Sequence, residues 1–334
     1  MIRIVSTIRS EPDHLADLRS QGFEVDLEER DPANFKQILT AELAASAEIL
    51  FCDHPPVNLD EMTALRLIQV ASVGTTQLDG LGLAERGIRV CNARGAFDVP
   101  IAEWNVTMMI NLLRDMRGMI RNQEAAVWDR DPHFQQELRG STVGIWGYGG
   151  IGRETARLGK ALGLTIHALT RHGSPGPRED IYCLPGTGDP EGKFPDRFFT
   201  PDQTEEFLAG LDFLILAIPM SPQNEGIVGE AELAALPGHA FVLNPARGPL
   251  IQEAALLRAL EKGEIAGAAL DTHYHYPMPP DHPLWKMPNV IMTPHISGSS
   301  GSPHFLSRTW DILSQNAARY ASDSSLLNEV TMSG

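Results

Sequence analysis

The sequence predicts two α/β domains, each with a parallel β-sheet and helices on both faces. Three observations lead to this expectation. A chain of 334 residues is too long for one hydrophobic core. Short apolar runs alternate with amphipathic segments over the first hundred residues, and a second such series begins at Ser141. An alternation of strand and helix patterns is typical of parallel sheets.

The first series contains four apolar runs that predict buried strands, at residues 2–8, 23–27, 48–52 and 67–72. The segment FKQILTAELAASA, residues 35–47, predicts a helix between the second and third of these strands. A longer helical pattern, IAEWNVTMMINLLRDMRGMI, follows at residues 101–120. Apolar residues nearly encircle this helix, so we expect it to be buried between domains or subunits.

The second series predicts six strands, at residues 141–147, 164–170, 212–219, 240–245, 266–272 and 289–294. The segment Gly173–Phe198 interrupts it. This segment is rich in Gly, Pro, Asp and Glu, so it predicts a surface insertion. A last helix from about Pro303 to Tyr320 is expected to pack back on the first domain.

Composition and charge exclude several classes of function. The net charge is −16, whereas binding to nucleic acid or to an anionic membrane favours a basic surface. No apolar run reaches the roughly 18 residues that a membrane span needs. The three cysteines Cys52, Cys91 and Cys183 lack metal-ligand spacing, which indicates reduced thiols in a cytoplasmic protein.

A glycine-rich turn follows the predicted strand at Ser141. Gly147, Gly149 and Gly152 form the spacing G-x-G-x-x-G, with a strand before it and an amphipathic helix after it. The first glycine allows the tight turn, the second lets the backbone approach a pyrophosphate, and the third lets helix and strand pack closely. The pattern therefore predicts a dinucleotide whose pyrophosphate lies at the helix N-terminus.

The end of the next strand bears on which dinucleotide is used. Enzymes that use NAD usually have an acidic residue there, which accepts hydrogen bonds from the ribose. This sequence has Thr170 instead, followed by Arg171 and His172. Arginine pairs with a 2′-phosphate that a carboxylate would repel, so we expect a preference for NADP(H). NAD(H) remains possible, because Arg171 could also lie over the adenine.

Together with the glycine turn, four further motifs are specific in combination: AIPMSPQNEGIVG, NPARG, AALD and TPHISG. With them the sequence resembles the D-isomer-specific 2-hydroxyacid dehydrogenases from about Leu67 to Tyr320, and the glyoxylate/hydroxypyruvate reductases among them. The resemblance implies two doubly wound domains. A Rossmann dinucleotide domain, residues 101–294, would be inserted into a flavodoxin-like substrate domain of residues 1–100 and 295–334. It also implies a homodimer with the helix at 101–120 in the interface.

The resemblance assigns roles to single residues. Arg247 of NPARG would bind the carboxylate and carbonyl of a 2-oxo acid, and His295 of TPHISG would be the acid/base residue. Val73 and Gly74 would offer backbone N–H groups to the substrate carboxylate. The expected cofactor-binding residues are Gly147, Tyr148, Gly149, Gly150, Ile151, Gly152, Thr170, Arg171, His172, Pro219, Ala246, Asp271 and Gly298.

One position departs from the family pattern. Most members have a glutamate that hydrogen-bonds the histidine, whereas this sequence has Tyr276 before Pro277. We expect Tyr276 to position His295 or to contact the substrate, although Asp271 or a neighbouring histidine could replace it as partner. Without the carboxylate, His295 is expected to titrate near its unperturbed pKa of about 6.5, and reduction should favour acid pH. His273 and His275 are potential metal ligands, but one strand cannot close a metal site, and none is expected.

The leading hypothesis is therefore a 2-oxoacid reductase that prefers NADP(H). The segments PMPPDHP and MTPHISGSS also resemble the formate dehydrogenase branch, which lacks the same glutamate. That branch holds formate with an asparagine at a position where this sequence has Phe97. Phe97 and Tyr276 instead suggest an aromatic-walled pocket for a bulkier 2-oxo acid. A dinucleotide-sensing binding protein on the same fold is a third hypothesis.

Overall fold

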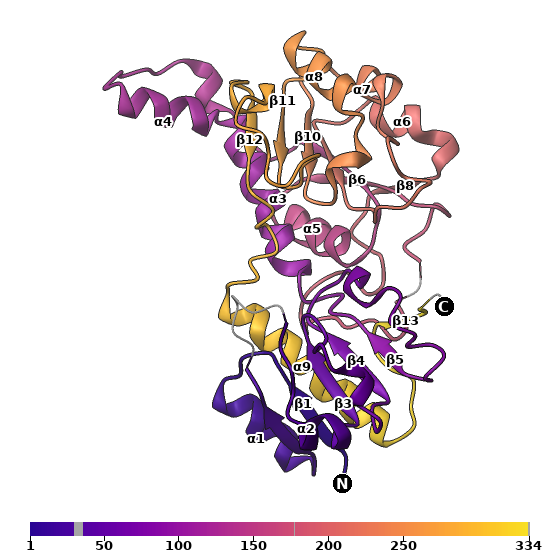
Figure 1. Ribbon diagram of the computed structural model, residues 1–334. Coiled ribbons are helices and arrows are strands. Elements are labelled where there is room, and N and C mark those ends of the chain that lie inside the picture. Colours follow the sequence, from indigo (N-terminus) through magenta and orange to yellow (C-terminus); the bar gives the residue numbers. More distant parts are fainter. Residues whose placement is uncertain (30–35, 177, 333–334) are drawn as a thin grey trace. The chain divides into compact units, whose positions relative to one another are not determined.

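The structure is a computed structural model, and it describes residues 1–29, 36–176 and 178–332. The chain forms two compact units (Figure 1). The terminal unit comprises Met1–Phe97, Arg178–Leu184 and Ser300–Gly334, and the central unit comprises Asp98–Pro177 and Pro185–Ser299. Each unit contains one sheet, which confirms the predicted fold class. The domain boundaries drawn from the resemblance remain a prediction.

The terminal unit has a six-stranded sheet that is parallel except at one edge. Its strands, in spatial order, are β13 (Glu329–Val330), β5 (Arg89–Cys91), β4 (Leu67–Val70), β3 (Ile49–Cys52), β1 (Arg3–Ser6) and β2 (Glu24–Leu27). Only β13 runs antiparallel to its neighbour among these strands. All four strands predicted in the first series are therefore present.

Helices cover both faces of this sheet, because successive strand residues point to opposite sides. Ile4 packs with α1 (Pro12–Ser20) and α9 (Pro303–Ala321) on one face. Val5 packs with α2 (Ala41–Ser46) on the other face. The helix predicted over residues 35–47 is therefore shorter than expected, and residue 35 lies outside the described residues. The indole of Trp310 in α9 meets the Phe51 ring at 5.0 Å, so the last helix packs back on the first domain as predicted.

The central unit has a seven-stranded parallel sheet. Its spatial order is β12 (Val290–Met292), β11 (Gly267–Leu270), β10 (Phe241–Asn244), β9 (Phe213–Leu216), β6 (Thr142–Trp146), β7 (Thr165–Leu169) and β8 (Arg197–Phe199). From β6 to β8 the chain adds strands toward one edge of the sheet, and from β9 to β12 it adds strands toward the other edge. The order therefore reverses between β6 and β9, where doubly wound folds bind ligands.

Two sets of helices bury the faces of the central sheet. Ile145 contacts one cluster, which includes apolar side chains of α3 (Asp98–Leu113) and α5 (Gly150–Ala161). Trp146, the next residue, contacts the cluster formed with α6 (Thr204–Leu208), α7 (Glu230–Ala235) and α8 (Glu253–Glu261). No helix of the described residues is long and apolar enough to cross a membrane.

The prediction of one continuous helix over residues 101–120 is wrong. The chain breaks after α3 and resumes as α4 (Met116–Glu124). Asp115 causes the break because it adopts a left-handed conformation, with φ +40°, and its side chain accepts the Gly118 N–H at 2.9 Å. The apolar pattern continues through this point and hides the break. In Figure 1, α4 extends away from the central sheet as an arm.

The prediction of a surface insertion at Gly173–Phe198 is also wrong in part. Its residues Arg178–Leu184 belong to the terminal unit, whereas the flanking residues belong to the central unit. Tyr182 is only 2% exposed and packs in a cluster with Ala93 and Ile312. The Asp180 carbonyl accepts the Asn328 N–H at 2.8 Å. A buried tyrosine within a polar segment has no sequence signal, because its partners lie far along the chain.

Candidate active site

Most of the predicted site residues follow strands of the central sheet. The parallel strands bring their carboxyl ends to one edge, where loops after β6, β7, β9, β10, β11 and β12 meet. Arg247 follows β10, Tyr276 follows β11 and His295 follows β12. Because β10, β11 and β12 are neighbours, these three residues lie on adjacent loops.

The glycine turn has the shape that a pyrophosphate requires. Gly147 has φ +102°, and a Cβ there would lie 2.6 Å from the Ala217 carbonyl oxygen. A Cβ on Gly152 would lie 2.4 Å from the Gly147 carbonyl oxygen. By contrast, nothing lies within 4 Å of a Cβ placed on Gly149, so this side of the turn is open. Gly147 therefore fits the tight turn, Gly152 fits the close packing of helix on strand, and Gly149 leaves the approach to the α5 N-terminus open.

Gly150 packs against a side chain of α3, a contact that the sequence analysis did not predict. A Cβ on Gly150 would overlap the carboxylate of Asp98, the first residue of α3. Tyr148 is 5% exposed, and its hydroxyl donates to the Asp189 carboxylate at 2.6 Å. The side chain of Tyr148 is therefore held inside the protein, and the turn can offer its backbone to a ligand.

The loop after β7 has a specific conformation. The Thr170 hydroxyl donates to the Ser174 carbonyl at 2.9 Å and accepts the Ser174 N–H at 3.1 Å. Arg171 and His172, between these residues, are exposed. The hydroxyl of Thr170 therefore closes the loop, and Arg171 gives the loop a positive charge.

Arg247 is oriented by the buried side chain of Asn244. The Asn244 Oδ1 accepts the N–H groups of Ala246 and Arg247 at 3.1 and 3.2 Å, and its Nδ2 donates to the Arg247 carbonyl at 2.8 Å. Such turns fix the backbone that follows the asparagine. The Arg247 side chain is exposed, with one Nη donating to the Ala246 carbonyl at 2.7 Å. Its remaining donors can meet a planar carboxylate.

Tyr276 and His295 form a direct pair. The Tyr276 hydroxyl lies 3.2 Å from His295 Nδ1, and it also accepts the His273 backbone N–H at 3.3 Å. The bond at Nδ1 leaves Nε2 of His295 as the nitrogen available to a substrate. A cis Tyr276–Pro277 peptide bond lies in the same segment.

His295 does not keep its ordinary pKa, which corrects the prediction. Partial burial and the nearby positive charge of Arg247 lower the pKa of His295 below 6.5, and His273 adds to this effect. The charge of Asp271 acts in the opposite direction without overcoming them. A tyrosine hydroxyl carries no charge to stabilise the imidazolium, so the lowering is not offset at Nδ1.

Asp271 builds the loop that carries His295. It is fully buried, and its carboxylate accepts the Thr293 hydroxyl and the N–H groups of Ile296 and Ser297, at 2.5, 2.9 and 3.0 Å. The His295 N–H donates to the Asp271 carbonyl at 2.8 Å. These bonds hold His295 in a left-handed conformation with φ +56°. The sequence analysis placed Asp271 among the cofactor ligands and named it as an alternative partner of His295; here Asp271 holds the backbone of the His295 loop, whereas Tyr276 bonds the ring.

Four further residues that the sequence analysis singled out also lie in the loops that follow the central strands. Pro219 follows β9, and its carbonyl accepts the Asn224 side-chain amide at 2.8 Å, while Gly298 lies in the His295 loop. The buried His273 ring bonds the Thr293 carbonyl at 2.8 Å, and His275 is exposed. The described residues contain no group of three His, Cys, Asp or Glu side chains that could hold a metal ion.

The predicted substrate-binding residues Val73, Gly74 and Phe97 lie in the terminal unit. The Val73 carbonyl accepts the Asn92 amide at 2.9 Å and the Gly74 carbonyl accepts the Ser72 hydroxyl at 2.7 Å, which fixes this exposed loop. The ring of Phe97 packs on Phe305, with centroids 4.8 Å apart. The contribution of Phe97 to a substrate pocket stays a prediction.

Comparisons with known proteins agree with this geometry. A family model described as "D-isomer specific 2-hydroxyacid dehydrogenase, NAD binding domain" matches residues 106–297. A glyoxylate reductase of Thermofilum pendens is 30% identical over 246 residues, which are 72% of this chain and 68% of that protein. A D-3-phosphoglycerate dehydrogenase of Archaeoglobus fulgidus is 29% identical over 286 residues, 85% of this chain, and the chain spans 51% of its length. The solved NADPH-dependent glyoxylate/hydroxypyruvate reductase of Sinorhizobium meliloti is 27% identical, with TM-score 0.70 over 99% of this chain and 98% of that chain.

Proposed function

This chain belongs to the D-isomer-specific 2-hydroxyacid dehydrogenase family, and on that premise we propose that it reduces 2-oxo acids to D-2-hydroxy acids with NADPH. One arrangement carries the proposal: Arg247, held by Asn244, and His295, paired with Tyr276, lie on loops after adjacent strands. The same edge of the sheet carries the glycine turn, which is open for a pyrophosphate. A bound dinucleotide would supply the hydride. The chain would supply substrate orientation and the proton.

Arg247 and His295 have distinct roles in this proposal. The guanidinium of Arg247 would bind the substrate carboxylate and polarise the carbonyl that accepts the hydride. The Nε2 of protonated His295 would donate a proton to the developing alkoxide. Tyr276 would hold the imidazole ring through Nδ1. Val73 and Gly74 would bind the substrate carboxylate through their backbone N–H groups.

The preference for NADPH rests on the loop after β7. This loop has no carboxylate where NAD enzymes usually bind the ribose, and it exposes Arg171 and His172. A relative of known structure from Sinorhizobium meliloti is described as NADPH-dependent. Both observations favour a 2′-phosphate over a free 2′-hydroxyl, and the preference is therefore proposed as a property of this loop.

Initial rates would test the proposal. NADPH and NADH oxidation would be followed at pH 6 with glyoxylate, hydroxypyruvate, pyruvate, 2-oxobutyrate and phenylpyruvate, and formate with NADP⁺ or NAD⁺ would be assayed in parallel. We expect reduction of at least one 2-oxo acid, with a higher kcat/KM for NADPH. Formate oxidation without any reduction would contradict the proposal, and so would binding of NADPH with no turnover of any acid.

Tyr276 should determine the pH range of the reduction. The change Tyr276→Glu places a carboxylate near Nδ1, which stabilises the imidazolium and should raise the pH at which reduction falls off by about one to two units. The measurement is kcat/KM for reduction between pH 5 and pH 9. Tyr276→Phe is the matched control, because it removes the hydroxyl without adding charge and should not shift the profile upward. Superimposable profiles for wild type and Tyr276→Glu would contradict this role.

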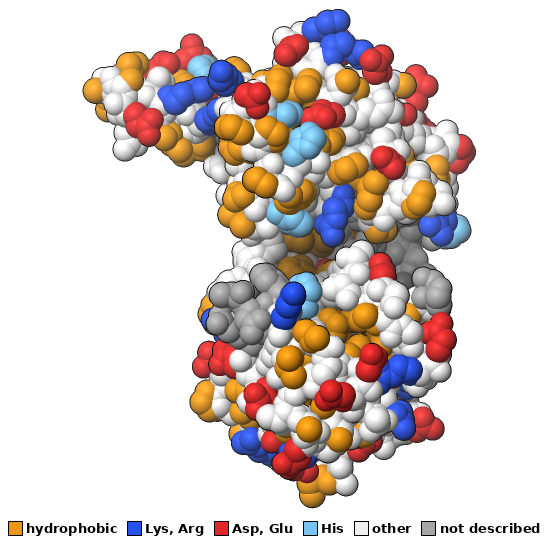
Figure 2. Space-filling model, in the orientation of Figure 1, with side chains coloured by type: hydrophobic (Ala, Val, Ile, Leu, Met, Phe, Trp, Pro, Cys, Tyr) orange, Lys and Arg blue, Asp and Glu red, His pale blue; other side chains and the backbone are white. Residues whose placement is uncertain are grey.

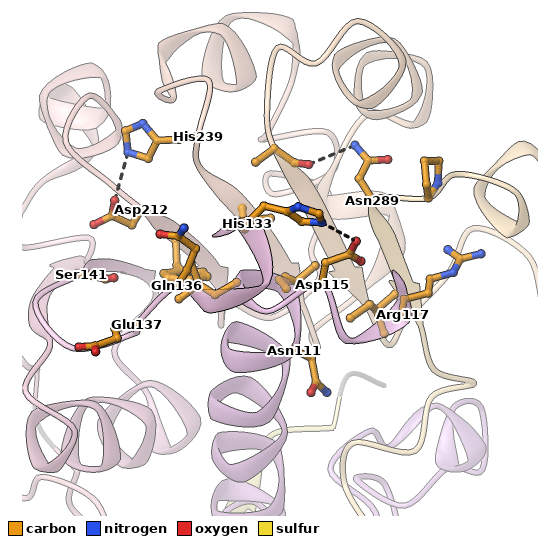
Figure 3. Close-up of a pocket in the computed structure, with 17 residues that line it drawn as sticks. Asn111, Asp115, Arg117, His133, Gln136, Glu137, Ser141, Asp212, His239 and Asn289 are labelled. Atoms are coloured by element: carbon orange, nitrogen blue, oxygen red, sulfur yellow. Dashed lines mark hydrogen bonds and ion pairs between the residues drawn. The ribbon is translucent and has the colours of Figure 1, made fainter. Parts of the chain in front are cut away.

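The arm of the central unit supports the proposed homodimer. Hydrophobic side chains gather on it in Figure 2, and Ile120, Val127 and Trp128 are 51%, 53% and 90% exposed. Next to α4 lies a cavity of about 650 Å³ at the amino ends of the central strands (Figure 3). Apolar side chains such as Leu112, Phe241 and Ile291 line part of it. An exposed indole on an arm whose first residues line a partly apolar cavity is typical of a surface that a partner covers.

Replacing Trp128 should therefore weaken the dimer. For Trp128→Glu we expect a loss of dimer affinity of about 30-fold or more, because buried interface tryptophans commonly contribute 2 kcal/mol or more. Sedimentation velocity over a range of protein concentrations would measure it. Val57→Glu is a matched control, since Val57 is 61% exposed but lies in the terminal unit. A wild-type protein that is monomeric at micromolar concentration would contradict the dimer.

A further inference from the structure

We propose that Arg153 is a positioning residue for cofactor choice, which holds the loop at residues 170–176 so that it favours NADPH over NADH. This loop, called the β7 loop below, carries the exposed Arg171 and His172. The inference rests on the proposed function, because it requires a dinucleotide on the glycine turn. It adds a buried residue that would act on cofactor choice through the loop.

Arg153 connects the dinucleotide helix to the far end of the β7 loop. It lies in the first turn of α5, and its side chain is only 1% exposed. One terminal nitrogen donates to the carbonyl of Gly176 at 2.8 Å and to that of Pro175, and the other donates to the carbonyl of Asp189. The guanidinium fork places donors on two separate nitrogens, so it reaches carbonyls on two sides. A lysine ammonium carries its donors on one nitrogen, and an apolar side chain has none.

A second connection runs through Asp189, which is 4% exposed. Its carboxylate accepts the Tyr148 hydroxyl at 2.6 Å and the N–H groups of Lys193 and Phe194 at 2.9 and 3.0 Å. The Arg153 guanidinium also lies 5.2 Å from the centre of the Tyr148 ring. Because Tyr148 stands within the glycine turn, the turn, α5 and the segment after the β7 loop form one connected structure.

The β7 loop is therefore held at both ends. Thr170 closes it by its two hydrogen bonds with Ser174, and Arg153 holds Pro175 and Gly176. Arg171 and His172 lie between these fixed points. A loop that is ordered before binding loses less entropy when a phosphate binds to it. NADH has no 2′-phosphate, so its binding should depend much less on the order of this loop.

Calorimetric titration with cofactor fragments would test the role of Arg153. Adenosine 2′,5′-bisphosphate carries the 2′-phosphate and AMP does not, and both would be titrated into the full-length protein. For Arg153→Met we expect about tenfold weaker binding of the bisphosphate and less than about twofold weaker binding of AMP. The ratio of kcat/KM values for NADPH and NADH should fall to a similar extent, with little change in kcat.

A second arginine of the central unit provides a matched control. Arg117 lies in α4 and donates to the carbonyls of Trp285, Met287 and Val290. It therefore also holds three backbone oxygens, but none of them belongs to the β7 loop. Arg117→Met should leave the ratio of the two fragment affinities unchanged. If Arg153→Met does not fold, Arg153→Lys should show the same loss of preference, because it keeps the charge but not the fork.

The outcomes separate this inference from the proposed function. A wild-type preference for the bisphosphate that survives in Arg153→Met would overturn only the inference, as would an equal loss of affinity for both fragments. A wild-type protein that binds both fragments alike would overturn the proposed NADPH preference and the inference with it. Selective loss of bisphosphate binding would support both.

Discussion

Replacing His295 by asparagine should lower kcat for 2-oxo acid reduction by about 10²- to 10⁴-fold, which is the usual contribution of a positioned proton donor. Asparagine is the suitable replacement because His295 has φ +56°, a conformation that asparagine tolerates. The variant therefore removes the proton without straining the loop that Asp271 organises. NADPH binding, measured by fluorescence titration, should not change, because this change leaves the glycine turn and the β7 loop intact.

The control for this variant is His275→Asn. His275 lies on the same segment as Tyr276 and is exposed, so the same substitution should leave kcat within about twofold of wild type, as is usual for surface positions. Unchanged reduction by His295→Asn would mean that another group donates the proton. Loss of NADPH binding together with kcat would mean that the loop itself has been damaged.

The lowered pKa of His295 gives the wild-type reaction a definite pH dependence. In the proposed mechanism reduction needs the imidazolium, so its rate should fall as pH rises through the lowered pKa of His295. Oxidation of a D-2-hydroxy acid needs the neutral ring, so it should increase over the same pH range. The neutral form must also present an unprotonated Nε2, which is possible when the Tyr276 hydroxyl accepts a hydrogen bond from Nδ1–H. Initial rates in both directions between pH 5 and pH 9 would show these opposite trends.

Regular periodicity made much of the fold predictable. The alternation of strand and helix patterns predicted two parallel sheets, and glycines at 147, 149 and 152 predicted the turn between β6 and α5. The pattern failed where one residue overrides the periodicity. Asp115 ends α3 by adopting a left-handed conformation, although the apolar pattern runs on into α4. A single backbone torsion of this kind leaves no trace in the spacing of hydrophobic residues.

Candidate site residues could be predicted where they stand in a local motif, whereas the distant residues that support them could not. Arg247 and His295 stand within short motifs, but their supports depend on the fold. Asn244 orients Arg247 through an asparagine turn, and Arg153 reaches carbonyls 22 and 23 residues away in sequence. The pKa of His295 was misjudged for the same reason, because its neighbourhood with Arg247 arises only when β10 and β12 join one sheet.

Arg247 should have two separable effects, one on substrate binding and one on His295. In the proposed mechanism, Arg247→Met would eliminate two charge-assisted hydrogen bonds to the substrate, each worth about 1.5–3 kcal/mol. We therefore expect kcat/KM to fall by about 10²- to 10⁴-fold. The same change removes a positive charge that lowers the pKa of His295, so the remaining reduction should extend to higher pH than in wild type.

Arg247→Lys distinguishes these effects. Lysine keeps the positive charge but cannot bind a carboxylate through a planar fork, so kcat/KM should fall while the pH profile stays near that of wild type. Arg66→Met is a control, since exposed Arg66 likewise donates to the carbonyl of the preceding residue, at 2.7 Å, but lies in the terminal unit. If Arg247→Met and Arg247→Lys share one pH profile, the charge of Arg247 does not act on His295, and partial burial together with His273 must account for its lowered pKa.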